Sequence, residues 1–324
     1  MNFPKILLLG SVALFIVIGG AAGFKKFAGS KPKIIEEKAV VKAVKPLTVS
    51  KPQVQETGDI PMVNRMDELF STGDKKLPIV ETLSYESSVP WLKGRPAWIG
   101  DYASYYTTSR HFIARSLNGK ADYFTQKVSP GKLFNVFKKD KNFQFYLLVD
   151  LSRCKMAFYY IDLDANERIL LKTYRIGVGK QADTPSGSLT PVGRYQLGEK
   201  IAVYKPGIMG LFHDKEVEMI KVFGTRWLPF GKELSKETLS TKSFGSAKGL
   251  GIHGAPWDFN KKSNRWVEIR QAVGSCESDG CIRMTFEDME ELFSIVITKP
   301  TVVDIVRNFK EAHLPGVEVV SPKP

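Results

Sequence analysis

The chain has 324 residues, which at about 150 residues per domain leaves room for two domains. Its composition, 43% hydrophobic and 25% charged, is that of an ordinary globular protein and excludes a wholly disordered or wholly membrane-embedded chain. The formal net charge of +13 is accompanied by no Lys/Arg block, zinc-finger spacing or RNP-like aromatic motif. We therefore expect anionic lipid headgroups or an acidic polymer as its counterpart, and no nucleic acid.

The N-terminal segment 1–27 predicts a membrane anchor. Nineteen residues from Ile6 to Phe24 carry no charge, and a helix of that length would reach about 28 Å, close to the hydrocarbon thickness of a bilayer. Lys5 precedes this stretch, as in a signal anchor that holds the rest of the chain outside the membrane. Small residues at 20–23 offer the alternative of a signal peptide that is cleaved.

Two segments follow this predicted anchor. Residues 28–57 are rich in lysine and proline and show no lasting amphipathic period, which indicates an extended linker. Residues 58–140 hold many aromatics, among them Trp91 and Tyr102, with turn signals between short elements. This pattern indicates a small mixed α/β accessory domain of unknown role. A small hydrophobic core explains the aromatics better than the alternative, an aromatic groove for a sugar or peptide.

A mainly β domain is predicted over 141–309. Two hydrophobic runs, 143–150 and 154–161, flank a short connection and predict a β-hairpin. The run 169–179 continues the strand pattern, and turn residues gather after it. The run 301–306 predicts a buried closing strand.

A helix is predicted shortly before that closing strand. Thr285, with Asp288 three residues later, is typical of a helix N-cap and its partner. The apolar residues that follow have helical spacing and share one face. They are Met289, Leu292, Phe293 and Val296. Residues 310–324 are assigned as a C-terminal tail, whose part after His313 is expected to be loosely held.

Two clusters of residues could carry nucleophilic chemistry. His253 stands in Ile-His-Gly-Ala-Pro-Trp at 252–257, and Cys281 stands in Ser-Asp-Gly-Cys-Ile-Arg-Met at 278–284. A free thiol with a pKa of about 8.5 becomes a better nucleophile when a cationic or basic neighbour stabilises its thiolate. Backbone N–H groups in the Gly-Cys turn could hold an oxyanion. From these residues alone, a structural role for both side chains stays open.

The remaining cysteines and histidines indicate neither a disulfide framework nor a metal site. The chain has three cysteines and four histidines, without the paired Cys/His spacings of zinc sites. Cys276 lies five residues before Cys281. A regulatory disulfide between them or mere proximity in a loop would explain this spacing, and we prefer the second. Cys154, within a predicted strand, is expected to be a core residue.

The motifs together resemble the L,D-transpeptidase family and its YkuD-like catalytic domain. The resemblance lies in Ile-His-Gly-Ala-Pro-Trp followed by Ser-Asp-Gly-Cys-Ile-Arg-Met. Three upstream elements come in the family's order: the strands at 143–161, Thr-Pro-Val-Gly at 190–193 and Phe-Gly-Thr-Arg-Trp at 223–227. The resemblance covers about 141–307. It implies a β-sandwich-like catalytic domain with a short helix after the nucleophile loop.

The resemblance also implies roles for the two clusters. Cys281 would be the nucleophile, His253 the general base, and the carbonyl of Gly254 would orient the imidazole. The amides of Gly280 and Cys281 would help to form the oxyanion hole. Ser278 would hydrogen-bond within the loop or line the donor site, and we prefer the loop role.

Four further features of the resemblance leave alternatives open. Arg283 would fix the loop or hold a substrate carboxylate, with a structural ion pair as an equal alternative. Trp257 would shape the pocket wall, with core packing as its alternative. Asp279 stands where many family members have a second histidine; pointing inward it would raise the pKa of the Cys281 thiol, so we expect it to turn away or to pair with Arg283. Residues 258–274 are either a basic lid or a solvated excursion.

The implied function is L,D-transpeptidation of peptidoglycan stem peptides. Cys281 would form a thioester with a tetrapeptide stem, release D-Ala and pass the acyl group to an amine, without a metal or organic cofactor. The alternatives are an L,D-carboxypeptidase, which gives the same acyl group to water, and an inactive peptidoglycan-binding scaffold. Carbapenems would acylate Cys281.

The N-terminal helix would hold the enzyme in the inner membrane with its catalytic domain in the periplasm or envelope; secretion after signal cleavage is the alternative.

Overall fold

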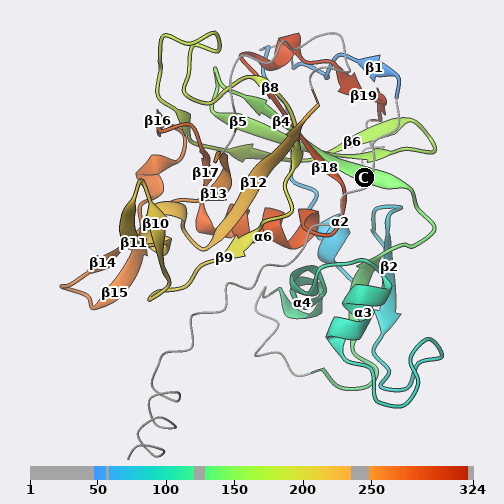
Figure 1. Cartoon of the computed structure of the whole chain (residues 1–324). Helices are drawn as coiled ribbons and strands as arrows, with labels where there is room; N and C mark the ends of the chain where they lie inside the picture. Colours follow the sequence, from blue (N-terminus) through green and yellow to red (C-terminus); the bar gives the residue numbers. More distant parts are fainter. Residues whose placement is uncertain (1–46, 56–57, 120–127, 235–246, 248, 320–324) are drawn as a thin grey trace, which may run out of the picture. The chain divides into compact units, whose positions relative to one another are not determined.

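The computed structural model describes residues 47–55, 58–119, 128–234, 247 and 249–319 (Figure 1). All of these belong to one compact unit, Glu36–Pro324. The predicted membrane anchor at 1–27 lies outside the described residues. Among the described residues, no helix has both the length and the apolar character needed to cross a bilayer.

Ten strands form one curled, mixed sheet, which confirms the mainly β fold class. Neighbouring strands are antiparallel except in three pairs, β17 with β13, β18 with β4, and β20 with β6. The order across the sheet is β17 (Ile282–Met284), β13 (Gly251–Gly254), β12 (Arg226–Glu233), β8 (Gly193–Leu197), β18 (Thr301–Val306), β4 (Phe143–Asp150), β5 (Lys155–Asp162), β6 (Glu167–Arg175) and β20 (Val317–Glu318), while β9 (Ala202–Val203) pairs with β12.

The strands and the helix that the sequence predicts within this domain are confirmed. β4 and β5 form the expected antiparallel hairpin, and 301–306 is the central strand β18. The helix is α6 (Phe286–Val296), whose N-cap Thr285 accepts a hydrogen bond from the amide of Asp288. The run 169–179 is the exception, because β6 ends at Arg175 and the chain then enters a separate short strand, β7 (Val178–Gly179).

The central strands are buried on both faces, which explains their unbroken hydrophobic runs. Phe145, Leu147 and Val149 of β4 lie in the core that α6 covers, together with Leu292 of that helix. The alternate residues of β4 lie in a second core on the opposite face. The expected sandwich-like packing is therefore one curled sheet with a hydrophobic core on each side.

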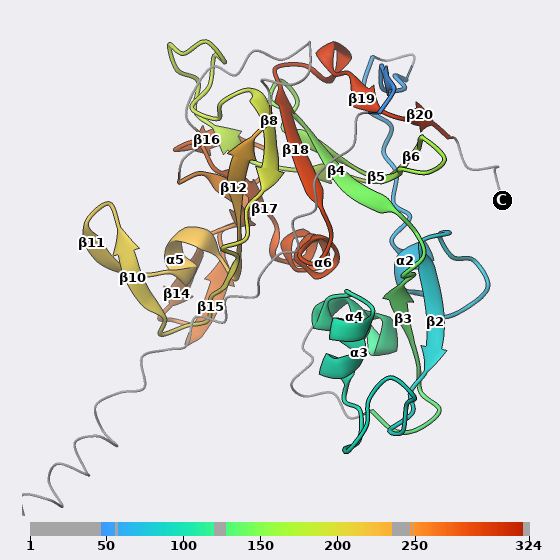
Figure 2. The same cartoon turned by 45° about the vertical axis from the view of Figure 1, so that its right-hand side comes forward.

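Residues 58–140 contain α2 (Asp67–Phe70), β2 (Val80–Ser84), α3 (Ile99–Tyr105), α4 (Arg110–Asn118) and β3 (Leu133–Phe137), grouped below the sheet in Figure 2. Tyr102 is buried in a small core with Tyr85 and Phe134, so the aromatics of this segment do pack a core. Leu69 and Phe137 lie instead in the main core beside β4. The segment therefore shares a hydrophobic core with the sheet, and its separation as a domain stays a prediction.

Both described ends of the chain are tied to the sheet edge at β6 and β20. The expectation that the tail after His313 is loosely held is wrong for its described part. β19 (Leu314–Pro315) pairs with β1 (Val49–Ser50), and β20 pairs with β6. Arg168 of β6, only 1% exposed, donates to the carbonyl of Lys51 and to the carboxylate of Glu318. Because a buried guanidinium requires acceptors, this contact holds the two ends together.

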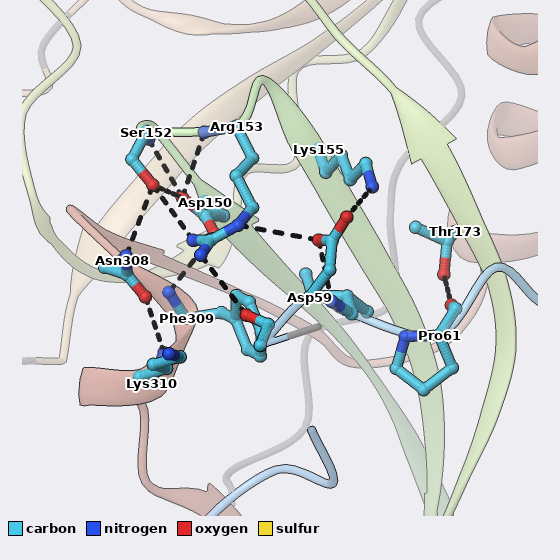
Figure 3. A network of polar contacts seen from close by, with 12 residues as sticks. Asp59, Pro61, Asp150, Ser152, Arg153, Lys155, Thr173, Asn308, Phe309 and Lys310 are labelled. Carbon is cyan, nitrogen blue, oxygen red and sulfur yellow. Dashed lines mark hydrogen bonds and ion pairs between the residues drawn. The ribbon is translucent and has the colours of Figure 1, made fainter. Parts of the chain in front are cut away.

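A second polar network ties the segment at 58–61 to the turn between β4 and β5 (Figure 3). The carboxylate of Asp150 accepts hydrogen bonds from the amides of Ser152 and Phe309 and from the guanidinium of Arg153. Arg153 and Lys155 in turn form ion pairs with Asp59. The β4–β5 turn is therefore braced from three parts of the chain.

We predict that Arg168→Met lowers the free energy of unfolding by about 3–5 kcal/mol, because it leaves the carboxylate of Glu318, 9% exposed, without its cationic partner. Denaturant titration measures the change, and limited proteolysis should show earlier cleavage near residues 50 and 317. The matched control is Arg95→Met, whose guanidinium is half exposed in its ion pair with Asp101, with an expected loss well below that of Arg168→Met. Equal losses in the two variants would contradict the argument.

Candidate active site

Parallel pairing of β13 with β17 brings the two predicted catalytic residues to neighbouring strands. Ile252 lies opposite Ile282, and His253 lies opposite Arg283. Both isoleucines are buried in the main core. Since side chains alternate along a strand, His253 and Arg283 point to the other face. Cys281 immediately precedes β17, and the charge of Arg283 acts on both Cys281 and His253, so Arg283 lies near both. The backbone amide of Gly251 lies within hydrogen-bonding reach of the Cys281 thiol.

His253 is enclosed and oriented. Its side chain is 2% exposed, and its ring lies 5.2 Å from that of Phe223 and 5.9 Å from that of Trp227. Nδ1 lies 2.7 Å from the carbonyl oxygen of Gly254. Because a carbonyl only accepts, Nδ1 carries the proton, and in the neutral ring Nε2 is the basic nitrogen.

Burial holds the imidazole neutral. It lowers the pKa of His253 to about 4, a shift that the nearby Arg283 reinforces and that the carbonyls of Gly254 and Phe223 oppose. At neutral pH the ring is therefore a base ready to accept a proton.

Burial also raises the pKa of the Cys281 thiol above its usual value. The amide of Gly251 and the positive charge of Arg283 act in the opposite direction, and the charge of Asp279 adds a smaller upward effect. At rest both groups are therefore uncharged, a thiol at Cys281 and a neutral imidazole at His253.

The nucleophile loop is built around Ser278. This buried hydroxyl donates to the carbonyl of Cys281 at 2.6 Å and accepts from the amide of Gly280 at 3.1 Å. Ser278 thus has the loop role that we preferred. The same contact corrects one expectation, because the amide of Gly280 donates within the loop and is not directed at an oxyanion.

Glycine is required at position 280. Its φ of +116° lies in the region that side chains disfavour, and a Cβ there would stand 2.8 Å from the carbonyl oxygen of Leu189. The carbonyl of Gly280 accepts from the hydroxyl of Thr190 at 2.9 Å, and Thr190 also accepts from the amide of Gly179. Thr190 therefore positions the loop. The sequence showed it only as part of a turn motif.

Asp279 points away from the thiol. It is exposed and forms a 3.0 Å ion pair with Lys180, which is the main reason that its pKa is lowered. The expectation that it would turn away is met, but its partner is Lys180 and not Arg283. Lys180 lies 99 residues earlier in the chain, so no local sequence signal could indicate it.

Arg283 has no carboxylate partner among the residues that the structure describes. Its side chain is half-buried, and Nε is a buried donor without an acceptor in the described ranges. The alternative of a structural ion pair is therefore unsupported there. A guanidinium beside Cys281 and His253 suits a substrate carboxylate, since its planar fork matches that group.

Trp257 begins a hairpin beside the site. β14 (Trp257–Asn260) and β15 (Arg265–Glu268) form most of the apparent insertion at 258–274. The indole of Trp257 packs edge-on against Phe286 at 5.5 Å, while its Nε1 is buried without an acceptor in the described part of the chain. Arg270 at the base of the hairpin forms ion pairs with Glu268 and Glu287. Packing thus explains the position of the Trp257 ring, but it provides no hydrogen-bond acceptor for the ring N–H.

A second hairpin lies next to the first in both views (Figures 1 and 2). β10 (Met209–Phe212) and β11 (Lys215–Glu218) lead into α5 (Ile220–Phe223). Phe212 contacts Phe223, which contacts His253, so an aromatic series joins this hairpin to the base. Leu211 is 78% exposed. We did not predict this hairpin from the sequence.

No group of three or more metal-ligating side chains occurs among the described residues.

The family model of the YkuD L,D-transpeptidase catalytic domain matches residues 144–305. No match was found among curated proteins. Among solved structures, the chain is similar to the helical cell shape determining protein Pgp2 from Campylobacter jejuni, at 19% identity and a TM-score of 0.30, over 52% of this chain and 51% of that one. It is also similar to L,D-transpeptidase 3 from Mycobacterium tuberculosis, at 12% identity and a TM-score of 0.30, over 55% of this chain and 76% of that one.

The matched range contains every strand from β4 to β18 except the last residues of β18 and the first of β4. It includes β13, the nucleophile loop and α6. This chain spans about half the length of the Pgp2 structure. The chain belongs to the L,D-transpeptidase family and carries its YkuD catalytic domain.

Proposed function

We propose that this protein is a peptidoglycan L,D-transpeptidase that works through a thioester on Cys281. The observation that carries the proposal is that Cys281 immediately precedes β17, whose Arg283 lies opposite His253 and acts on both reactive side chains. Family membership supports the reaction class. The donor would be a tetrapeptide stem, and the acceptor would be an amine of a neighbouring stem.

The protonation states define the first step. The thiol of Cys281 transfers its proton to the neutral imidazole of His253 while the sulfur attacks the carbonyl of the diamino acid. The carbon–nitrogen bond to D-Ala then breaks, and the departing amine takes the proton from the imidazolium. Because Ser278 occupies the amide of Gly280, we assign the oxyanion contact to the amide of Cys281.

The second step returns the enzyme to its resting state. An acceptor amine attacks the thioester carbonyl, gives a proton to His253 and displaces the thiolate of Cys281, which is then reprotonated. Water in place of the amine would make the enzyme an L,D-carboxypeptidase. Throughout, Arg283 would hold a carboxylate of the stem peptide, and Trp257 would shape the pocket wall.

We also propose that the N-terminal segment anchors the protein in the inner membrane and that the catalytic domain works in the cell envelope. The support is the uncharged run from Ile6 to Phe24. Because the proposed substrate lies outside the cytoplasm, the catalytic domain must be exported across the inner membrane. Fractionation of cells expressing the full chain would test this location.

The central experiment incubates the purified protein with disaccharide tetrapeptides and analyses the products by mass spectrometry. We expect release of D-Ala and formation of cross-linked dimers, and we expect Cys281→Ala to abolish both, since no other group can form the acyl-enzyme. Lys180→Gln, on the exposed ion pair with Asp279, is the matched control and should stay within about threefold of the wild type.

The other outcomes of this experiment separate the alternatives. Tripeptides without dimers would identify a carboxypeptidase. Unchanged substrate with correctly folded wild-type protein would contradict an enzymatic role and favour a peptidoglycan-binding scaffold.

Acylation by a carbapenem should lose half of its rate near pH 4 and not near pH 6.5. His253 is neutral and able to accept the thiol proton above its pKa of about 4, and it is protonated and inactive below that value. The rate should rise again at alkaline pH, where the Cys281 thiol ionises. Intact-protein mass spectrometry of the adduct at each pH measures the rate, with circular dichroism as the control for folding. A midpoint near pH 6.5 would show that His253 is not the base or is not buried.

Arg283→Met should lower kcat/KM for the free-acid stem peptide by about 10–100-fold, mainly through KM, because a charge-assisted contact is worth about 1.5–3 kcal/mol. A peptide whose carboxylates are amidated supplies the control. On the amidated peptide, kcat/KM of the wild type should fall by a similar factor. The substitution Arg283→Met should then lower kcat/KM on that peptide little further. If Arg283→Met lowers kcat/KM by the same factor relative to the wild type on both peptides, Arg283 does not bind a carboxylate.

A further inference from the structure

Cys154 and Cys276 lie side by side although 122 residues separate them in the sequence. Their sulfur atoms are 3.4 Å apart. Cys154 is buried in the main core, as expected, while Cys276 is exposed. The neighbour of Cys276 is therefore Cys154, and not the catalytic Cys281 that follows it five residues later. Two thiols in contact can be converted to a disulfide, whereas isolated thiols cannot.

The backbone on the Cys154 side is fixed. Cys154 ends the β4–β5 turn, which the carboxylate of Asp150 braces through its bonds to Ser152, Arg153 and Phe309 (Figure 3). The carbonyl of Cys154 accepts from the amide of Ile176 at 2.9 Å.

The backbone on the Cys276 side is fixed as well. Cys276 begins β16 (Cys276–Ser278), which runs parallel to β7 with Cys276 opposite Val178. β16 leads directly through Ser278 into the nucleophile loop. A disulfide needs its sulfurs at about 2.05 Å, so they must approach by roughly 1.4 Å, a movement that side-chain rotation can supply.

An external oxidant can reach this pair. A cavity of about 230 Å³ is lined by Cys276 together with Gly179, Gln181, Ser186, Ser188 and Arg307. The guanidinium at its edge gives the cavity a positive charge, which suits a small disulfide that carries carboxylates. Burial and, to a smaller extent, the neighbouring Cys276 together raise the pKa of Cys154 to about 12, so Cys154 stays a thiol at neutral pH. Cys276 is therefore the residue that reacts first.

We propose that Cys154 and Cys276 form a reversible disulfide by exchange with a small, anionic disulfide. The Cys276 thiolate attacks one sulfur of the oxidant, whose sulfur–sulfur bond breaks and releases the first small thiolate. This step leaves Cys276 in a mixed disulfide with the other half of the oxidant. Cys154 then loses its proton to solvent and attacks the sulfur of Cys276, and the mixed disulfide breaks to release the second small thiolate. The protein loses two hydrogen atoms, and the oxidant is reduced to two thiols.

This disulfide has two consequences for the site. It ties β16, the strand before the nucleophile loop, to the braced β4–β5 turn, so β16 cannot separate from that turn. It also removes Cys276 from competition for Cys281, which becomes the one free thiol of the three cysteines in the chain. The inference concerns thiol pairing and does not depend on the proposed reaction.

The test uses the full chain with Cys281→Ser, which leaves only the two cysteines in question. The protein is incubated with oxidised glutathione, labelled with a maleimide under denaturing conditions and weighed intact. We expect a loss of two hydrogen atoms, no maleimide label, and a digest in which the peptides of Cys154 and Cys276 are joined; dithiothreitol should restore two labels. A stable glutathione adduct on Cys276 with Cys154 still labelled, or an unmodified protein, would overturn the proposal.

Melting temperatures provide a second measurement, which compares oxidised and reduced wild type with the surface variant Cys276→Ser. The oxidised wild type should melt at least about 5 °C above the reduced form, since closing a long loop restricts the unfolded chain. Cys276→Ser should melt at the same temperature in both conditions. Equal melting of the two wild-type forms, or a peptide that joins Cys276 to Cys281, would contradict the proposed tether.

Discussion

β13 and β17 are short, and yet their parallel register determines where every reactive group lies. Ile252 and Ile282 anchor the two strands in the main core, and the alternation of side chains then turns His253 and Arg283 to the opposite face. A shift by one residue in β17 would bury the guanidinium of Arg283 among aliphatic side chains and expose Ile282. The register is thus enforced by the cost of burying a charge.

The site places Cys281 and His253, the proposed nucleophile and its proposed base, in a poorly solvated environment, with consequences for reactivity. Both shifts of pKa favour the uncharged forms, so the resting enzyme holds little thiolate at Cys281. A thiol in this state reacts slowly with oxidants and alkylating agents. Cys276, exposed at the surface cavity, is the more accessible thiol. Once Cys276 is oxidised, its neighbour Cys154 can attack it and form the proposed disulfide.

Local sequence patterns predicted the features that depend on local geometry. The strands at 143–161, the N-cap at Thr285 and the two catalytic clusters follow from alternation, capping and motif spacing. Patterns did not predict contacts between distant parts of the chain. Lys180 as the partner of Asp279, and Cys154 as the neighbour of Cys276, depend on pairing of β7 with β16.

The terminal segments show the same limit. The tail after His313 was expected to be loosely held, but the buried Arg168 supplies donors that hold its described part and the strand β1. Arg168 belongs to a strand that gave no sign of this role, because a charged residue at a strand end is normally solvated.

The placement of β1 has a mechanical consequence. The described chain enters the catalytic unit at β1, beside β6 and β20, whereas the nucleophile follows β16 and precedes β17 at the other end of the strand order. A pulling force applied at residue 47 would act first on the β1–β19 pair and on the contacts of Arg168. It would reach β17 only after crossing the width of the sheet, so the geometry of Cys281 and His253 is insulated from tension on the N-terminal side.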